Sequence, residues 1–243
     1  MFEMKPLDII IPVYRGLDET KECILSLLPG MPDWARLIVV NDCSPEPALT
    51  QWLREQASPL GFELYENEKN KGFVGTVNFG MALHPDRDVL LLNSDVEVAN
   101  SDWLERMRLA AYRHERVASL TPFSNNATIC SFPHFCQDNA LFAELDVNAL
   151  DRLFSTLPLE DELVEVPTGV GFCMYIRRDC LDAVGYFDEQ TFGKGYGEEN
   201  DWCQRAHKLG WKIITSLISL HTTKGGSAFK KKGILARLEH LSY

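Results

Sequence analysis

The sequence predicts a single α/β domain with a mostly parallel central sheet and helices on both of its faces. Short apolar runs alternate with amphipathic segments along the first third of the chain, which is the pattern of β-α-β units. Residues 89–92 read V-L-L-L, which is typical of a strand buried on both faces of a parallel sheet. The 243 residues contain no internal repeat and no low-complexity linker, so one domain is favoured over two.

The first half of the chain contains most of the expected regular structure. Apolar runs bounded by turn residues predict strands, and apolar residues at helical spacing predict the helices between them. The expected strands span residues 7–13, 36–40, 62–66 and 89–92, and the expected helices span residues 19–28, 48–56 and 74–83.

The second half is less regular. Proline and asparagine residues interrupt the pattern between residues 121 and 166, so loops are expected there with one helix. Regular patterns return after that segment. The expected elements are helices at residues 148–155, 179–184 and 198–209, strands at residues 171–177 and 212–217, and a Gly-rich connection at residues 193–197.

Composition argues against several classes of protein. With 24 Lys and Arg residues against 35 Asp and Glu residues, the net charge is −11, which argues against a general nucleic-acid-binding protein. No apolar run approaches the roughly 20 residues of a membrane-spanning helix, and the N-terminus shows no signal-peptide pattern, so a cytoplasmic protein is expected. The 7 cysteines form no C-x-x-C pair, which argues against a disulfide framework or a zinc site.

Polar residues follow the expected strands of the first half. Ligands of open parallel sheets bind beyond the carboxyl ends of the strands, so these residues are expected to share one edge. A proline and a tyrosine stand after the first strand where a G-x-G-x-x-G turn would lie, so a dinucleotide-binding fold is set aside. The residues that follow the four strands are Pro12, Val13 and Tyr14, then Asn41 and Asp42, then Lys71 and Gly72, then Asn93, Ser94 and Asp95.

Six segments occur in the order found in one enzyme family. They are IIIPVYRG, VVNDCSPE, NKGFVGTVNFGM, LLLNSDVEV, GVGFCMYIRRDCLDAVGYFDE and GYGEENDWCQRAHKLGW. Together they resemble inverting glycosyltransferases of family two, which have the glycosyltransferase-A fold, and the resemblance runs from about Leu7 to Phe229. The segment TPFSNNATICSFP with GYGEEND looks like enzymes of bacterial cell-surface polysaccharide synthesis, rhamnosyltransferases among them.

The resemblance implies a catalytic domain over residues 1–229. Its nucleotide-binding half would span residues 1–120, and its acceptor-binding and catalytic half residues 121–229. Residues 230–243 are a basic amphipathic segment, in which three lysines precede apolar residues at helical spacing. Such a segment could pack on its own domain, lie on an anionic membrane at the inner face of the plasma membrane, or begin a further module.

The resemblance also implies a nucleotide-diphospho-sugar donor, with dTDP-rhamnose or a UDP-hexose as leading candidates, and a glycan or lipid-linked acceptor. Asp42 would accept a hydrogen bond from the N3–H group of uracil or thymine, a role favoured over the alternative that an Asp in N-D-C-S-P caps a helix or holds a turn. The residues expected to hold the donor are Pro12, Val13, Tyr14, Asn41, Asp42, Lys71, Gly72, Asn93, Ser94 and Lys224.

Asp95 and His221 are the expected ligands of a Mn²⁺ or Mg²⁺ ion. A departing diphosphate needs its charge offset, and hard oxygen ligands hold the ions that do this. Asp95 directly follows a buried strand, and in the family a His at the place of His221 commonly completes the site. Asn93 stands where the first Asp of the family's D-x-D segment often stands. Glu97, flanked by two valines, is expected to be a solvated side chain.

Glu199 is the expected general base. It begins an apolar stripe on the helix expected at residues 198–209, so its carboxylate should point toward the core, whereas neighbouring acids would only complement the helix dipole. It aligns with the acid of the family's E-D motif that deprotonates the acceptor hydroxyl, with Glu in place of the commoner Asp. Asp201 would hold the loop or the acceptor, with Arg205 one turn below as its ion-pair partner.

Two other functions stay open. A catalytically inactive domain that binds nucleotide sugars or glycans would fit Asn93 and the Glu at position 199. A sugar nucleotidyltransferase would need a Gly-rich loop with Lys or Arg after the first strand, for which Arg15 and Gly16 are a weak match.

Overall fold

The computed structural model of the chain describes residues 3–140, 143, 145–157, 163–193 and 195–223, with only the backbone for Leu163 and residues 216–223. The helices are α1 (Leu17–Leu27), η1 (Leu28–Gly30), α2 (Pro47–Leu60), α3 (Gly72–Ala82), α4 (Trp103–Arg113), η2 (Thr128–Cys130), α5 (Val147–Phe154), α6 (Arg178–Val184), α7 (Glu189–Phe192) and α8 (Glu198–Lys208). The strands are β1 (Leu7–Val13), β2 (Ala35–Asn41), β3 (Glu63–Glu66), β4 (Asp88–Leu92), β5 (Val96–Glu97), β6 (Val117–Ser124), β7 (Leu163–Glu165), β8 (Cys173–Ile176) and β9 (Lys212–Thr223).

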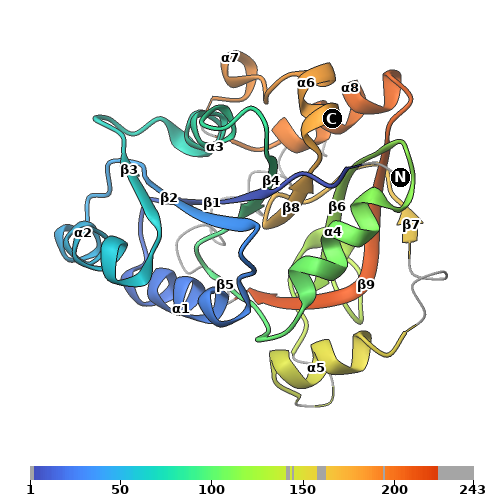
Figure 1. Cartoon of the computed structure of the whole chain (residues 1–243), viewed down its shortest axis with the longest axis horizontal. Helices are drawn as coiled ribbons and strands as arrows, with labels where there is room; N and C mark the ends of the chain where they lie inside the picture. The colour runs from blue at the N-terminus through green and yellow to red at the C-terminus, as the bar shows by residue number, and fades with distance from the viewer. Residues whose placement is uncertain (1–2, 141–142, 144, 158–162, 194, 224–243) are drawn as a thin grey trace, which may run out of the picture.

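The strands form one sheet in the order β3-β2-β1-β4-β8-β6-β9-β5, with β7 paired to β9 (Figure 1). The first four strands are parallel to one another. The pairing of β1 with β2 runs from Leu7 opposite Ala35 to Val13 opposite Asn41, so these strands end at the same level. The carboxyl ends of the first four strands therefore share one edge, as the sequence predicts.

The predicted α/β fold is confirmed, but the sheet is mixed rather than mostly parallel. Among the described residues, four strand pairs are parallel and four are antiparallel. β8 runs antiparallel to both β4 and β6, because it begins with Cys173 opposite Leu92 and so enters the sheet from the carboxyl end of β4. The sequence does not reveal this direction, because a four-residue strand that is buried throughout has the same pattern either way.

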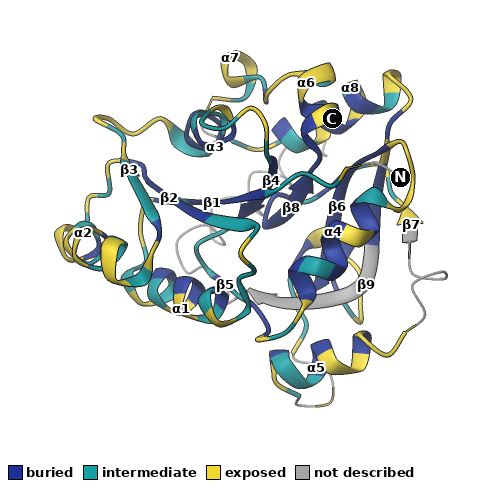
Figure 2. Ribbon diagram, in the orientation of Figure 1, coloured by how far each residue is buried: buried dark blue, intermediate teal, exposed yellow. Residues whose placement is uncertain are grey.

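Helices cover both faces of the sheet, as predicted (Figure 1). Ile9 and Ile11 of β1 pack in one core with α1, α2 and α4, whereas Ile10 packs in a second core with α3, α6 and α8. The buried residues accordingly lie along the central strands and the inner sides of the helices (Figure 2). Gly80 lets α3 approach the sheet closely, because an added Cβ atom there would lie 2.7 Å from Ile10 Cγ2.

Buried polar groups at the amino end of the sheet are paired inside the protein. Asp88 accepts hydrogen bonds from the hydroxyls of Tyr112 and Tyr175 at 2.8 and 2.6 Å, and from the N–H of Arg178 at 2.8 Å. Burial still raises the pKa of the Asp88 carboxyl above its usual range. Asp88 thus holds strands and helices together, and the candidate chemistry lies at the opposite, carboxyl edge.

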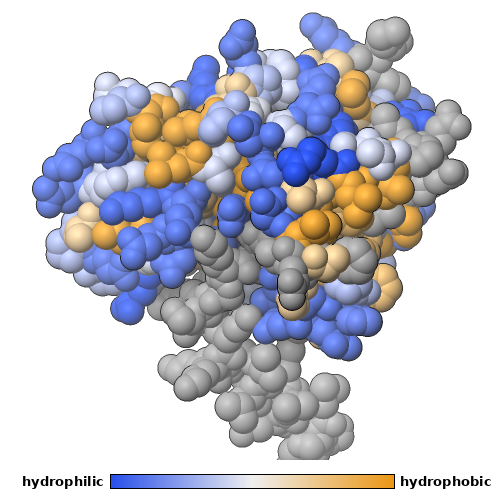
Figure 3. All heavy atoms as spheres, turned by 90° about the horizontal axis from the view of Figure 1, so that it is seen from below, coloured by the Kyte–Doolittle hydropathy of each residue, from blue (hydrophilic) through white to orange (hydrophobic). Residues whose placement is uncertain are grey.

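The surface seen from below carries separate hydrophobic patches with hydrophilic residues between them (Figure 3). Within the part of the chain that the structure describes, no helix has the length and apolar character to cross a bilayer. Three predictions fall outside what the structure describes: the donor contact of Lys224, the membrane contact of residues 230–243 and the metal contact of the His221 side chain.

Candidate active site

Hydrogen bonds tie the carboxyl ends of the first three strands together. The N–H of Asp42 donates to the carbonyl of Val13 at 2.8 Å, and the N–H of Asn67 donates to the carbonyl of Asn41 at 2.9 Å. Asn41 lies opposite Val13 in one neighbouring strand and opposite Glu66 in the other. The structure therefore brings together the residues that the sequence places after these strands.

Asp42 caps α3 from a distant part of the chain. Its side chain is buried, and its Oδ1 atom accepts from the N–H of Lys71 at 2.8 Å and from the side-chain amide of Asn67 at 2.8 Å. Its Oδ2 atom accepts from the N–H of Gly72 at 2.9 Å. A carboxylate in this place satisfies N–H groups at the helix start and suits the positive end of the helix dipole. The capping alternative is thus realised, and recognition of a base stays a prediction.

Asn41 is engaged by the turn that follows β2. Its amide nitrogen donates to Thr50 Oγ1 at 3.1 Å and to Glu66 Oε1 at 3.2 Å, and its oxygen accepts from the N–H of Ser44 at 2.9 Å. Both amide N–H groups are used inside the protein, so this side chain holds the turn.

Tyr14 is exposed directly after β1. It is 38% exposed, and the guanidinium carbon of Arg15 lies 5.6 Å from the centre of its ring. Pro12 is half-buried and Val13 is buried, so they form the base from which the ring projects. An exposed aromatic ring at this edge offers a flat face on which a planar group can stack.

A cavity of about 400 Å³ lies next to the Asp42 cap. Two of its lining residues, Asn67 and Lys71, are the ones that bond to Asp42. The ammonium group of Lys71 lies 5.2 Å from the centre of the Phe79 ring. The cavity is lined by Glu66, Asn67, Glu68, Lys69, Lys71 and Phe79.

The segment after β4 lies against the middle and C-terminal part of α1. The N–H of Asn93 donates to the carbonyl of Phe172 at 2.8 Å, and the Cys23 thiol donates to the carbonyl of Asn93 at 3.4 Å. Ser94 and Asp95 are half-buried. Burial and then the charge of Asp95 raise the pKa of the Cys23 thiol to about 12, so Cys23 is a neutral core residue beside this segment.

The pairing of β5 with β9 places the backbone of His221 near Asp95. Thr223, two residues after His221, lies opposite Val96, which follows Asp95. Among the described side chains, no group of three His, Cys, Asp or Glu residues could hold a metal ion. Asp95 supplies one hard carboxylate, which suits an ion held largely by the phosphates of a substrate. The residues present therefore fit a divalent ion that binds with the donor.

Glu199 lies at the start of α8 and contacts the loop before β8. It is half-buried, and its Oε1 atom accepts from the N–H of Gly171 at 3.2 Å. Burial raises the pKa of the Glu199 carboxyl above its usual range. A Cβ atom added at Gly171 would lie 2.5 Å from Glu199 Oε1, so only glycine leaves room for the carboxylate here. The sequence predicts Glu199 but gives no role to Gly171.

Gly171 and Phe172 connect the two halves of the site. Phe172 accepts the hydrogen bond from Asn93, at the carboxyl end of β4, and the preceding Gly171 donates to Glu199. Asn93 and Glu199, far apart in sequence, are thus hydrogen-bonded to two consecutive residues.

Glu198 is more deeply buried than Glu199, with 3% of its surface exposed. Burial and the neighbouring charge of Glu199 raise the pKa of Glu198 to about 7. The apolar positions at helical spacing on α8 begin at Glu199 and do not include Glu198. This pattern predicts only which face of the helix packs on the core. A side chain at the first helical position instead leans back over the preceding turn.

Asp201 and Arg205 form the predicted ion pair, with Nε of Arg205 2.7 Å from Asp201 Oδ2. Arg205 also donates to the carbonyls of Val184 and Tyr186 at 2.8 and 2.9 Å. Through Arg205, Asp201 therefore helps to fasten α8 to the segment after α6. A direct contact of Asp201 with an acceptor stays a prediction.

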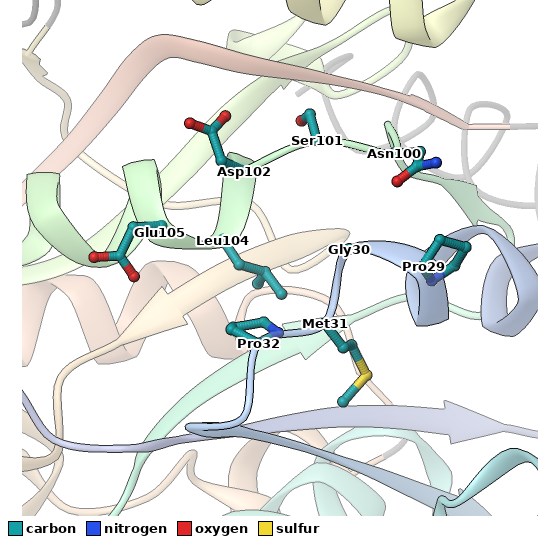
Figure 4. A pocket seen from close by; sticks show the side chains of 9 residues that line it. All are labelled: Pro29, Gly30, Met31, Pro32, Asn100, Ser101, Asp102, Leu104 and Glu105. Atoms are coloured by element: carbon teal, nitrogen blue, oxygen red, sulfur yellow. The ribbon is translucent and has the colours of Figure 1, made fainter.

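A second pocket, of about 380 Å³, lies between η1 and the start of α4 (Figure 4). Its polar side chains include the carboxylates of Asp102 and Glu105. None of the predicted site residues lines it, so it is separate from the candidate active site. Its lining residues are Pro29, Gly30, Met31, Pro32, Asn100, Ser101, Asp102, Leu104 and Glu105.

Replacing Asp42 by Ala is expected to lower the free energy of unfolding by about 1–3 kcal/mol, because three donors lose a buried acceptor. Asp18, an exposed acid in the first turn of α1 with no cap hydrogen bond recorded there, supplies the control. Asp18→Ala should change stability by no more than about 0.5 kcal/mol. Urea unfolding measures both. Equal effects of the two substitutions would contradict the capping role.

The solved structures that are similar to the chain include GalNAc-T7, PcManGT and TarS. GalNAc-T7 with UDP, GalNAc and Mn²⁺ gives a TM-score of 0.69 at 16% identity, covering 90% of this chain and 44% of that one. The mannosyltransferase PcManGT from Pyrobaculum calidifontis, in complex with GDP-Man and Mn²⁺, gives 0.66 at 16% identity, covering 98% and 62%. TarS of S. aureus (residues 1–349) gives 0.61 at 19% identity, covering 90% and 60%. At these identities the likeness shows the fold alone.

Comparisons of sequence identify the family to which the chain belongs. Uncharacterised proteins of Mycobacterium bovis and Mycobacterium tuberculosis are 42% identical over 53 residues, which are 21% of this chain and 20% of theirs. The chain therefore spans less than two thirds of the length of each relative named. Residues 8–185, well over half of the chain, match the family described as Glycosyl transferase family 2, in a match that covers β1 to α6 and ends before α8. The chain belongs to glycosyl transferase family 2.

Proposed function

We propose that the protein is an inverting, metal-dependent glycosyltransferase that moves a sugar from a nucleotide-diphospho-sugar to a glycan or lipid-linked acceptor. One observation carries the proposal. The Glu199 carboxylate, with its raised pKa, accepts a hydrogen bond from Gly171, the residue that precedes Phe172, whose carbonyl accepts from Asn93 at the edge of the sheet. A candidate base thus lies beside the strand end where we propose that the donor binds.

In this mechanism Glu199 removes the proton from an acceptor hydroxyl as the hydroxyl oxygen attacks the anomeric carbon. The new glycosidic bond forms as the bond to the diphosphate oxygen breaks, so a nucleoside diphosphate leaves and the configuration inverts. A carboxylate whose pKa is raised by burial is a stronger base than an exposed one, which favours this transfer near neutral pH.

The donor is proposed to lie along the carboxyl edge. Tyr14 would stack on the base above Pro12 and Val13, and Asp42 would accept from the base while capping α3. Asn41 would support this turn. The diphosphate and sugar would extend past Lys71, Gly72, Asn93 and Ser94, which lie at or near this edge. Lys224, which lies outside the described residues, would also contact them.

Asp95 and His221 would hold a Mn²⁺ or Mg²⁺ ion. Such an ion offsets the negative charge that collects on the leaving diphosphate. The Mn²⁺ in the structures of GalNAc-T7 and PcManGT supports a divalent ion in this fold. Those structures hold UDP and GDP-Man, so they favour no single base. A dTDP- or UDP-sugar, used by a hexosyl- or rhamnosyltransferase of bacterial surface polysaccharide synthesis, is proposed from the sequence resemblance.

The same resemblance supports the domain limits and the location. We keep residues 1–229 as the catalytic domain, divided at residue 120, with residues 230–243 as a separate basic segment. A cytoplasmic enzyme with peripheral contact at the inner face of the plasma membrane would meet a lipid-linked acceptor there.

A panel of nucleoside diphosphates with and without Mn²⁺ tests the donor site. We expect dTDP or UDP to raise the melting temperature only when Mn²⁺ is present, because the ion would hold the diphosphate. A ligand at 100 times its Kd stabilises the folded state by about 2.7 kcal/mol, which such a panel detects. The reaction products then separate the alternatives. Nucleoside diphosphate released from the matching sugar nucleotide indicates transfer, whereas pyrophosphate released from the corresponding nucleoside triphosphate and sugar 1-phosphate indicates a nucleotidyltransferase. Neither product in the two assays indicates an inactive binding domain.

A further inference from the structure

Glu198 is buried at the candidate active site in a way that the mechanism does not use. It is 3% exposed, and its Oε2 atom is buried without a hydrogen-bond partner among the described residues. A buried carboxylate oxygen in this state is costly, so its presence needs a physical reason.

The turn before Glu198 has an unusual backbone. Gly195, Tyr196 and Gly197 have φ angles of 128°, 77° and 105°, and the middle residue is not glycine. A tyrosine in the left-handed region is strained unless its surroundings hold it there. The backbone N–H groups of Tyr196 and of Glu198 itself act on this carboxyl group to lower its pKa, against the larger effect of burial. The side chain thus fastens the strained turn to the start of α8.

The same carboxyl group lies close to α3. A Cβ atom added at Gly195 would lie 3.6 Å from Glu198 Oε1 and 3.7 Å from the Cβ atom of Phe73. Phe73 is the second residue of α3, whose first residue, Gly72, donates to Asp42. The first turns of α3 and α8 and the turn at residues 195–197 therefore pack at one place.

We propose that Glu198 is a positioning residue, whose carboxyl group holds the turn at residues 195–197 against α3 and so fixes where Glu199 lies at the edge of the sheet. This inference rests on the proposed function, because the position of Glu199 affects a rate only if Glu199 is the base.

The substitution Glu198→Gln should preserve this positioning role. Its side-chain oxygen keeps an acceptor beside the turn at residues 195–197, and its amide has the shape of a protonated carboxyl group. The pKa of about 7 means that the neutral form of Glu198 is already well populated near neutral pH. Ala removes the acceptor, and Asp is one methylene too short to keep the same contact.

The experiment compares Glu198→Gln, Glu198→Ala and Glu198→Asp in the full chain. We expect Gln to keep kcat within about threefold, and Ala and Asp to lower kcat about 10- to 100-fold with the donor KM unchanged, because small displacements of a catalytic group are that costly. Hydrogen exchange of the Tyr196 amide should accelerate in Ala and Asp but not in Gln. Glu189→Ala is the control, since this exposed carboxylate also lies against α3, near Gly75.

The outcomes separate the two proposals. Faster exchange together with a lower kcat in Ala or Asp, and recovery in Gln, supports positioning. If Gln lowers kcat as much as Ala, the charge of Glu198 acts in the chemistry itself and the inference is overturned; unchanged exchange and kcat in Ala and Asp also overturn it. If no sugar nucleotide supports transfer by the unsubstituted chain, the proposed function fails, while the exchange measurement still decides whether Glu198 holds the turn.

Discussion

Replacing Glu199 by Gln is expected to lower sugar transfer by about 10²- to 10⁴-fold, the usual contribution of a positioned general base. The amide keeps the shape of the side chain and can still accept the hydrogen bond from Gly171, but it cannot take a proton at neutral pH. Binding of the nucleoside diphosphate should stay unchanged, because the residues proposed to hold the donor are not altered. Steady-state kinetics with the donor identified by thermal shift, and calorimetry of the nucleoside diphosphate, measure the two effects.

Two controls test the assignment of the base. Asp201→Asn should cost far less, because Asp201 is engaged by Arg205; the reverse order of effects would mean that the base has been misassigned. The pH profile is the second control. Burial raises the pKa of Glu199, so kcat/KM falls as pH drops through that raised value, and this acid limb disappears in Glu199→Gln.

Gly171→Ala tests the assignment of Glu199 as the base in a second way. The added Cβ atom would lie 2.5 Å from Glu199 Oε1, so the carboxylate must move. The substitution should lower kcat in the unsubstituted chain but add little in a Glu199→Gln background, because two changes that disable one group are not additive. Additive losses would show that Gly171 acts through something other than the base.

The sequence predicts most of the architecture because the central strands are apolar throughout and the helices have one apolar face. The antiparallel direction of β8, which the sequence does not predict, is set by contacts between distant parts of the chain. Its four residues are buried whichever way the strand runs, and its direction depends on where the preceding loop re-enters the sheet. β5 and β7 have only two and three residues, which is too short for a periodic pattern, and their pairing with β9 defines them.

The candidate site was predictable to a similar extent. The polar residues after the strands could be found because parallel strands end at one edge. What could not be found is which partner each residue takes. Asp42 caps α3, which begins 30 residues later, and not the helix that directly follows it. Glu198 folds back over a turn whose positive φ angles at residues 195–197 only partly follow from its glycines. Such contacts depend on tertiary geometry and leave no local periodicity.

Asp95→Ala is expected to weaken Mn²⁺-dependent binding of the nucleoside diphosphate by at least about 10- to 100-fold. Even groups that only orient a metal ligand typically contribute that much to metal affinity, and Asp95 would be a ligand itself. Binding measured with a chelator present should be the same in the variant and the unsubstituted chain, because only the metal-dependent part of the affinity is lost. Calorimetric titration with and without Mn²⁺ gives both values.

Glu97→Ala is the matched control, since Glu97 lies two residues along the same segment, in the short strand β5 opposite Thr222. Strand alternation places successive side chains on opposite faces, but residues two apart share a face only if the strand is regular between them. The turn at residues 94–95 precedes β5, so it breaks that relation. Glu97→Ala should therefore leave Mn²⁺-dependent binding intact. Equal losses in the two variants would place the ion between both carboxylates, and the chain would then bind its metal with two acids after β4 instead of one.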